Sequence, residues 1–180
     1  MIYLDNAATT KVSPQAAEGV ITGMTECFGN PSSLHKLGVD AERLVSFSQR
    51  KILSALGDTS GRIIFTSGAT ESNNTAVFGL AEVYGRRKKR VVTTSVEHPS
   101  VAKAFERLAE MGYEVAVIHP NEQGEITGDM LVNAVDGNTC LISAMLVNNE
   151  TGYILPIEKA FPKIKKLYPE CMTHCDCVQG

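Results

Sequence analysis

Short apolar runs alternate with helical patterns along most of the chain, and this alternation constrains the fold more than any other feature. The runs that are short and apolar enough for strands are 62–66, 91–94, 113–118, 140–147 and a weaker one at 172–175. Helical patterns separate them, at about 71–84, 100–111, 127–135 and 157–168. Nearly continuous apolar strands that alternate with helices are typical of a mostly parallel sheet covered on both faces. The sequence therefore predicts a three-layer α/β/α fold.

Two further helices are expected ahead of the first strand. Ser13 and Pro14 form a typical N-cap and first-turn pair, and apolar residues at helical spacing follow them. Residues 29–33 carry loop-forming side chains, and a second apolar helical face runs over about 39–56. Pro162 interrupts the last helical pattern of the chain, so that helix is expected to be kinked or to start late.

Length and composition exclude several classes of protein. The chain has 180 residues, 43% of them apolar and 21% charged, which is too apolar for a disordered protein. Its formal net charge of −3 gives no reason to expect nucleic acid as a partner. No apolar run approaches the ~20 residues of a membrane span, and the N-terminus does not resemble a signal peptide. We therefore expect no membrane partner and a cytoplasmic location.

The cysteines favour a reduced setting without a metal site. There are five of them, an odd number, and their spacing is not that of a disulfide framework. The run His174-Cys175-Asp176-Cys177 could be taken for a metal cluster. No second half-site with the usual paired spacing accompanies it, so no metal is expected.

Polar clusters follow four successive apolar runs, at the points where the strands are expected to end. These clusters are 66–74, 95–100, 148–152, and Asp176 with Gln179. In an open α/β sheet, ligands bind outside the carboxyl ends of the strands. The clusters therefore predict one site at one edge of the sheet.

Three of the clusters suggest a particular chemistry. Residues 67–70 lie at a strand-to-helix turn and suit an anion such as phosphate, although a helix capped by Ser67 or Thr70 explains them equally well. A lone histidine such as His98 is more often structural than catalytic. Asp176 follows an apolar strand, and a buried carboxylate there needs an N–H or cationic partner, such as a protonated ring nitrogen. Pyridoxal phosphate is a hypothesis that accounts for both the anion site and the acid.

Longer motifs carry a resemblance to a known family. The chain resembles the cysteine desulfurases, which are class V aminotransferase-like, fold-type I enzymes that use pyridoxal phosphate. The matching segments occur in the family's order across all 180 residues: 3–10, 29–35, 65–74, 97–98, 147–152 and 174–179. The resemblance implies the partial large domain of such a transferase. It divides the chain into an N-terminal segment with the first helix (1–30) and a truncated cofactor-binding domain (31–180).

The resemblance also implies roles for individual residues. Those assigned to the cofactor are Ala69 and Thr70 (phosphate), His98 (ring stacking and proton relay), Asn149 and Gln179 (phenolic oxygen) and Asp176 (ring nitrogen). Asn6, Ala7 and Thr9 would line the substrate side. The family converts L-cysteine to L-alanine and leaves a persulfide on a mobile cysteine. The sulfur passes to an acceptor or scaffold protein of iron–sulfur cluster or thio-cofactor assembly, and family members form homodimers.

Two departures from the family pattern limit this interpretation. Cys175 and Cys177 stand where the family usually has small or aliphatic residues, and neither is expected to carry the persulfide. The family's Ser-Gly-His-Lys motif, persulfide cysteine and C-terminal small domain have no counterpart in the 180 residues. We therefore expect the N-terminal portion of an enzyme, inactive alone and binding the cofactor non-covalently at best. Alternatives are a fragment of a related class V aminotransferase or selenocysteine lyase, and a non-catalytic relative that acts as a binding module.

Overall fold

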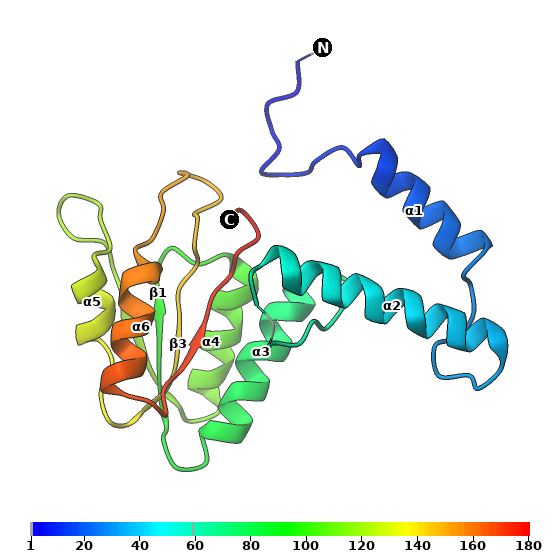
Figure 1. Cartoon of the computed structure of the whole chain (residues 1–180). Coiled ribbons are helices and arrows are strands. Elements are labelled where there is room, and N and C mark those ends of the chain that lie inside the picture. Colours follow the sequence, from blue (N-terminus) through cyan, green and yellow to red (C-terminus); the bar gives the residue numbers. More distant parts are fainter. Residues whose placement is uncertain (1, 59) are drawn as a thin grey trace. The chain divides into compact units, whose positions relative to one another are not determined.

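The chain divides into two compact units, the first ending at Phe65 and the second beginning at Thr66. The computed structural model describes residues 2–58 and 60–180. The first unit holds α1 (Pro14–Thr25) and α2 (Lys36–Ala55). The second holds, in chain order, α3 (Ala69–Tyr84), β1 (Arg90–Thr94), α4 (Pro99–Glu110), β2 (Glu114–Ile118), α5 (Gly128–Asn133), β3 (Thr139–Ser143), α6 (Ile157–Leu167) and β4 (Met172–His174), as Figure 1 shows. None of the helices in the described ranges is long and apolar enough to cross a membrane.

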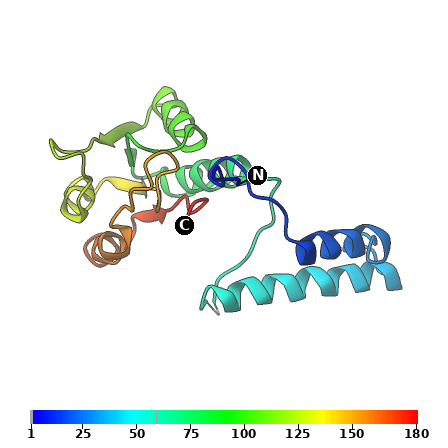
Figure 2. The same cartoon turned by 90° about the horizontal axis from the view of Figure 1, so that it is seen from above.

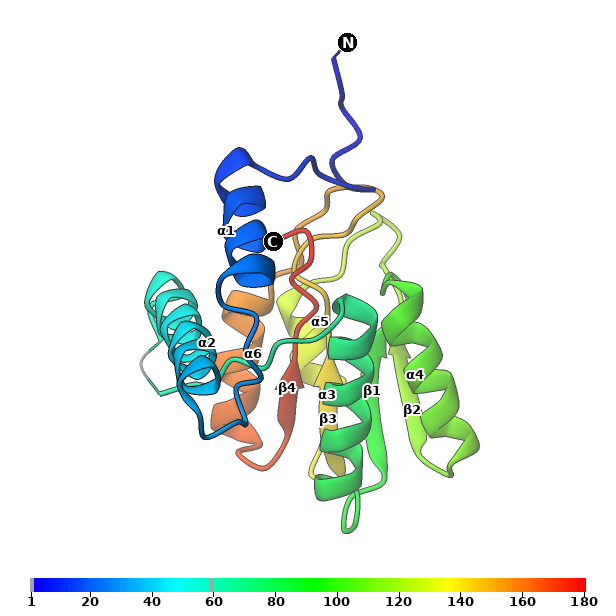
Figure 3. The ribbon, with the colours of Figure 1, turned by 90° about the vertical axis from the view of Figure 1, so that its right-hand side faces the viewer.

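The second unit is built on a four-stranded parallel sheet in the order β2-β1-β3-β4 (Figure 3). Val92 of β1 pairs with Ile142 of β3, and Ser143 of β3 pairs with His174 of β4. Because all four strands run the same way, their carboxyl ends lie at one edge of the sheet. The loops that follow the strands start from that edge.

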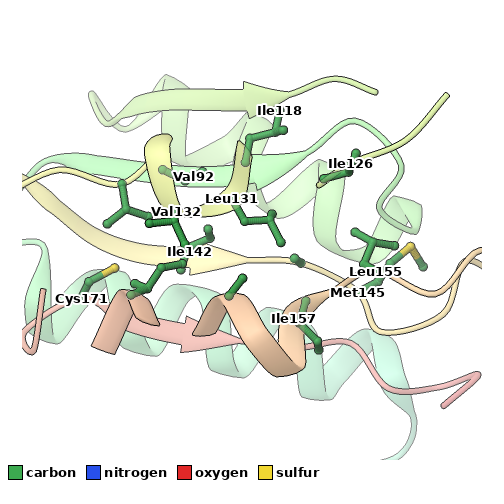
Figure 4. Packing of buried hydrophobic residues seen from close by; sticks show 14 residues of the cluster. Val92, Ile118, Ile126, Leu131, Val132, Ile142, Met145, Leu155, Ile157 and Cys171 are labelled. Atoms are coloured by element: carbon green, nitrogen blue, oxygen red, sulfur yellow. The ribbon is translucent and has the colours of Figure 1, made fainter. Parts of the chain in front are cut away.

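Two helices cover each face of the sheet, α3 and α4 on one side and α5 and α6 on the other (Figure 1). Neighbouring strand residues alternate between the two faces. Val91 and Leu141 belong to the cluster formed with α3 and α4, whereas Val92 and Ile142 pack with α5 and α6. Figure 4 shows the second cluster, in which Leu131 of α5 lies close to the strands. The three-layer α/β/α architecture predicted from the sequence is confirmed.

Two predicted strands need correction, and one alternative for the last helix is settled. Residues 62–66 form no strand, because no described segment pairs with them, and Ile64 is 77% exposed. The run 140–147 forms a strand only as far as Ser143, after which the chain leaves the sheet. It then closes a loop through an antiparallel bridge between Val147 and Ile154. The last helix runs from Ile157 with Pro162 inside it, so of the two expected outcomes the late start does not occur, and the kink stays a prediction.

The helices of the first unit follow the predicted local chemistry. Ser13 caps α1 by accepting a hydrogen bond from the backbone N–H of Ala16 at 3.2 Å. Figure 2 shows α1 and α2 as separate rods joined by a loop. That loop approaches α2 closely, because a Cβ atom at Gly38 would collide with the backbone of Asn30 and Ser33. Gly38 and Ala41 are the buried residues of α2, and α1 has none.

Candidate cofactor site

Hydrogen bonds hold the loops at the carboxyl edge of the sheet to one another. The backbone N–H of Leu146, in the loop after β3, donates to the carbonyl of Asp176, after β4, at 2.9 Å. The side-chain amide of Asn148 donates to the carbonyl of Val96, after β1, at 3.0 Å. These bonds join three polar clusters that are up to 80 residues apart in the sequence, counting from Val96 to Asp176.

The first turn of α3 is free of side-chain caps. The N-cap residue is Gly68, and no side chain makes a capping hydrogen bond there. Glu71 instead accepts bonds from the backbone N–H and the hydroxyl of Ser67, at 2.7 and 2.6 Å. These bonds lower the pKa of the Glu71 carboxyl. The interpretation of Ser67 or Thr70 as the cap is therefore wrong, and no side chain caps the N–H groups of this turn.

Asp176 is a buried carboxylate held by neutral donors. It is 5% exposed. Its Oδ2 accepts a bond from Nδ2 of Asn73 at 2.8 Å, and its Oδ1 accepts one from the backbone N–H of Val178 at 3.0 Å. No lysine or arginine in the described ranges forms an ion pair with it. Burial lowers the pKa of the His174 imidazole, which favours the neutral ring beside Asp176.

A chain of hydrogen bonds connects Asp176 to His98. Asn73 donates from Nδ2 to the hydroxyl of Ser100 as well, at 2.9 Å. The Ser100 hydroxyl lies 2.8 Å from Nδ1 of His98, and the backbone N–H of Ser100 donates to the same nitrogen at 3.1 Å. Because Nδ1 accepts this N–H, the neutral ring carries its proton on Nε2. His98 also caps α4, so its ring orientation is fixed at the start of that helix.

Glu97 ties the loop after β1 to the loop after β3. Its Oε1 accepts hydrogen bonds from the Thr94 hydroxyl at 2.6 Å and the Met145 backbone N–H at 3.0 Å. Its Oε2 is buried and has no hydrogen-bond partner among the described atoms. Burial raises the pKa of the Glu97 carboxyl, and the charge of Asp176 raises it further. Both effects favour the protonated acid.

A cavity of about 380 Å³ opens beside His98. It is lined by residues of the loops that follow β1, β2 and β3, including Glu97, His98, Pro120, Asn149 and Tyr153. The neighbouring Asn148 shapes this wall, because its Oδ1 accepts bonds from the backbone N–H groups of Glu150 and Thr151. The structure thus brings His98 and Asn149 to the same cavity.

The remaining candidates lie outside the lining of this cavity. Ala69 and Thr70 begin α3, one turn before Asn73. Gln179 is half-buried and follows Asp176 in a turn that ends at Gly180. Asn6, Ala7 and Thr9 belong to the first unit, in an exposed N-terminal segment. Their substrate-side role stays a prediction.

Two residues that carry this arrangement were not selected from the sequence. In the sequence, Asn73 and Ser100 are two members of larger polar clusters. A signal existed for Asn73, because it is spaced by four and eight residues from Val77 and Ala81, the other buried residues of α3. A polar residue on the buried face of a helix needs buried partners. Ser100 gave no comparable signal, because serine is common in the first turn of a helix.

Comparison with known proteins supplies the family. The model of the class V aminotransferases matches residues 2–180. A NifS/IcsS protein homolog of Lactobacillus delbrueckii subsp. bulgaricus is 44% identical over 100% of this chain and 46% of its own length. A cysteine desulfurase of Nostoc sp. is 37% identical over 100% of this chain and 44% of its own.

Solved structures agree with these relatives. A NifS-like protein superposes with a TM-score of 0.93 at 35% identity, over 99% of this chain and 49% of that one. SspA in complex with cysteine superposes with a TM-score of 0.87 at 32% identity, over 99% of this chain and 51% of that one. The chain therefore spans about half the length of the proteins it matches. It belongs to the class V aminotransferase family, and the relatives that it resembles include cysteine desulfurases.

Proposed function

We propose that the chain is the cofactor-binding part of a pyridoxal-phosphate-dependent cysteine desulfurase. The observation that carries the proposal is the hydrogen-bond chain from Asp176 through Asn73 and Ser100 to His98. It joins the acid and the imidazole that the family resemblance assigns to the two sides of one cofactor. Class V aminotransferases use pyridoxal phosphate, and the L-cysteine substrate is supported by the cysteine complex of SspA.

The residues present fit this cofactor. The uncapped first turn of α3, at Ala69 and Thr70, suits a phosphate. Asp176 is buried beside neutral donors only, so a protonated pyridine nitrogen would supply the cation that its surroundings lack. His98 presents its ring from the N-cap of α4, with Nδ1 already occupied. Asn149 and Gln179 are proposed to contact the phenolic oxygen.

The protein's own residues are proposed to bind and orient the cofactor. When bound, the cofactor would supply the electron sink for the chemistry at the substrate α-carbon. Asp176 would hold the proton on the ring nitrogen. His98 would stack on the ring, and its Nε2–H would be available to relay a proton. Asn73 and Ser100 position these two groups, because each donates toward one of them.

The rest of the reaction is proposed to need residues outside these 180. A lysine for covalent cofactor attachment and a cysteine for the persulfide are expected from the family, and no Ser-Gly-His-Lys motif occurs in the chain. We propose that residues 1–180 alone bind pyridoxal phosphate non-covalently and do not convert L-cysteine to L-alanine. The division into a segment 1–30 and a large domain from residue 31 belongs to the same proposal.

Association and location are proposed from the same resemblance. Several apolar side chains in α1, and Phe28 just after it, are exposed. Ile21, Met24 and Phe28 are 61–73% exposed. An exposed apolar surface of this kind favours a homodimer. A sulfur-accepting or scaffold protein and a cytoplasmic location complete the proposal.

Cofactor binding tests the proposal directly. We expect titration with pyridoxal phosphate, followed by absorbance and by calorimetry, to show saturable binding. The variant Asp176→Asn should bind about ten- to a hundredfold more weakly, because a charge-assisted hydrogen bond contributes about 1.5–3 kcal/mol. The matched control is Asp129→Asn, which removes an exposed carboxylate that is paired with Lys163. Equal affinity in wild type and Asp176→Asn, or no binding by a folded wild type, contradicts the proposal.

A further inference from the structure

Two thiols flank the buried Asp176 and face each other. The Sγ atoms of Cys175 and Cys177 lie 3.2 Å apart, directly after the end of β4. A disulfide bond is about 2.05 Å long, so a relative movement of about 1.2 Å would bring the sulfurs to bonding distance. One residue, Asp176, separates the two cysteines in the sequence. Cys177 is exposed and Cys175 is half-buried.

We propose that Cys175 and Cys177 form a dithiol site that a low-molecular-weight disulfide, such as oxidised glutathione, converts reversibly to an intramolecular disulfide. The family resemblance offers no role for this pair, since small or aliphatic residues are usual at both positions. Metal binding does not account for it, because no group of three or more histidine, cysteine or acidic residues in the described ranges is placed to hold an ion.

The different exposure of the two thiols sets the order of the steps. The exposed Cys177 meets the small disulfide first, and its thiolate attacks one sulfur, forming a mixed disulfide and releasing one small thiol. Cys175 then loses its proton to solvent and attacks Sγ of Cys177, which releases the second small thiol. The two cysteines lose two electrons and two protons, and the small disulfide is reduced to two thiols.

The electrostatics agree with this order. Burial raises the pKa of the Cys175 thiol, and the neighbouring Cys177, Glu97 and Asp176 raise it further. Such a thiol is a poor first nucleophile, but it resolves a mixed disulfide whose sulfur already lies next to it. Cys140 and Cys171 are fully buried, and burial raises the pKa of Cys171 to about 11. Neither competes for an oxidant in solution.

The disulfide would bear on Asp176, which lies between the two cysteines. Closing the ring restrains the backbone on both sides of this residue, whose carboxylate accepts bonds from Asn73 and Val178. The redox state is therefore coupled to the position of the buried carboxylate. This consequence rests on the proposed function, and it predicts at least tenfold weaker binding of pyridoxal phosphate by the oxidised protein.

Thiol counting tests the site without any cofactor. The reduced native protein is incubated with oxidised glutathione, denatured, and blocked with N-ethylmaleimide before intact-mass measurement and peptide mapping. We expect two fewer blocked thiols than in the reduced sample. The peptide that carries Cys175 and Cys177 should have both of these cysteines unblocked. Its mass should be two hydrogen atoms below that of the same peptide with two free thiols, and Cys171 should still be blocked. Dithiothreitol should restore both thiols.

Single-cysteine variants separate the two steps. After treatment with oxidised glutathione, Cys175→Ser should retain glutathione on Cys177. Cys177→Ser should show the same number of blocked thiols as before the treatment. The matched control, Cys27→Ser in the first unit, should lose two thiols as the wild type does. Two free thiols at Cys175 and Cys177 after oxidation, a lasting glutathione adduct on Cys177 of the wild type, or a bond to Cys171 overturns the proposal. The wild-type count decides even where a variant fails to fold.

The two proposals fail independently. If the reduced protein binds pyridoxal phosphate but forms no disulfide, the dithiol site is wrong and the proposed function stands. If the disulfide forms but the reduced protein binds no pyridoxal phosphate, the proposed function is wrong and the dithiol site stands. If both occur and the affinity is equal in the two redox states, the coupling to Asp176 is wrong.

Discussion

At the scale of single residues, Glu97 combines a structural bond with an unfavourable charge. Its Oε1 holds two loops together, while burial raises the pKa of the carboxyl. A raised pKa means that the folded state binds the proton more tightly than the unfolded state, whose pKa is near 4.5. The contribution of Glu97 to stability is therefore full below about pH 4.5 and is lost as the pH rises through the folded-state pKa.

The variant Glu97→Gln should remove this pH dependence. Glutamine has the shape of the protonated acid and keeps an oxygen for Thr94 and Met145, but it cannot ionise. We expect the free energy of unfolding to change less between pH 5 and pH 8 in Glu97→Gln than in the wild type, as measured by urea denaturation. The exposed Glu158→Gln in α6 serves as the control and should follow the wild type. A wild-type-like slope in Glu97→Gln would contradict the argument.

The sequence singles out Asp176 and His98 as candidates but not Asn73 and Ser100, whose hydrogen bonds connect them. Asp176 and His98 stand out because a polar residue follows an apolar strand, which is a local pattern. Asn73 is 103 residues from Asp176 along the chain, and its partner is decided by how α3 packs on the sheet. Such a contact follows from tertiary packing, so no spacing rule predicts it.

At the scale of single elements, α3 and the residue that ends it hold two glycines with opposite expected effects. Gly79 is exposed in the helix interior, and a Cβ atom there would meet nothing within 4 Å. Gly79→Ala should therefore raise the free energy of unfolding by about 0.5–1 kcal/mol. At Gly85, a Cβ atom would collide with the Tyr113 hydroxyl and the Ala81 carbonyl, which are hydrogen-bonded to each other at 2.8 Å. Gly85→Ala should lower the free energy of unfolding by about 1–3 kcal/mol.

Thermal and chemical denaturation of the two variants measure these effects. Each glycine acts as the control for the other, because the same substitution is made in or next to the same helix. A change of the same sign at both positions would show that helix propensity alone decides the outcome and that the contact between Gly85 and Tyr113 is unimportant.

The apolar runs also show that a strand-like sequence pattern does not always form a strand. The runs that became β1 and β2 pair with each other over five residues, and both were predicted correctly. The run 62–66 is as apolar, but it has no neighbouring strand in the described ranges to supply a hydrogen-bonded ladder. A β-strand exists only as part of a sheet, so propensity alone does not secure it.

At the scale of the whole molecule, stability is distributed unevenly. Both apolar clusters lie entirely within the second unit, from Val77 to Cys171. The 12-residue helix α1 has no buried residue, and isolated helices of this length are marginal in water. We expect hydrogen–deuterium exchange to be slowest in β1 and β3 and fast throughout α1. Protection of α1 equal to that of β3 would contradict this expectation and indicate that a partner covers its apolar side chains.

Fold class was predictable from the whole sequence because it depends on a repeated pattern. Each apolar run and each helical pattern added to the same conclusion, and the loss of one strand did not change it. The site depends on single contacts instead, and one missing partner changes its chemistry. The family motifs compensate in part, since they name residues such as Asn149 that no periodicity would select.

The buried carboxylate of Asp176 also bears on how long the protein survives in a cell. Its hydrogen-bond donors in the structure, Asn73 and the backbone N–H of Val178, are neutral. A cationic ligand that binds beside the carboxylate therefore stabilises the native state. A ligand present at a hundred times its dissociation constant adds about 2.7 kcal/mol to the free energy of unfolding. Proteases degrade the unfolded fraction of a chain, and that fraction falls as stability rises. The amount of this protein should therefore follow the supply of its ligand.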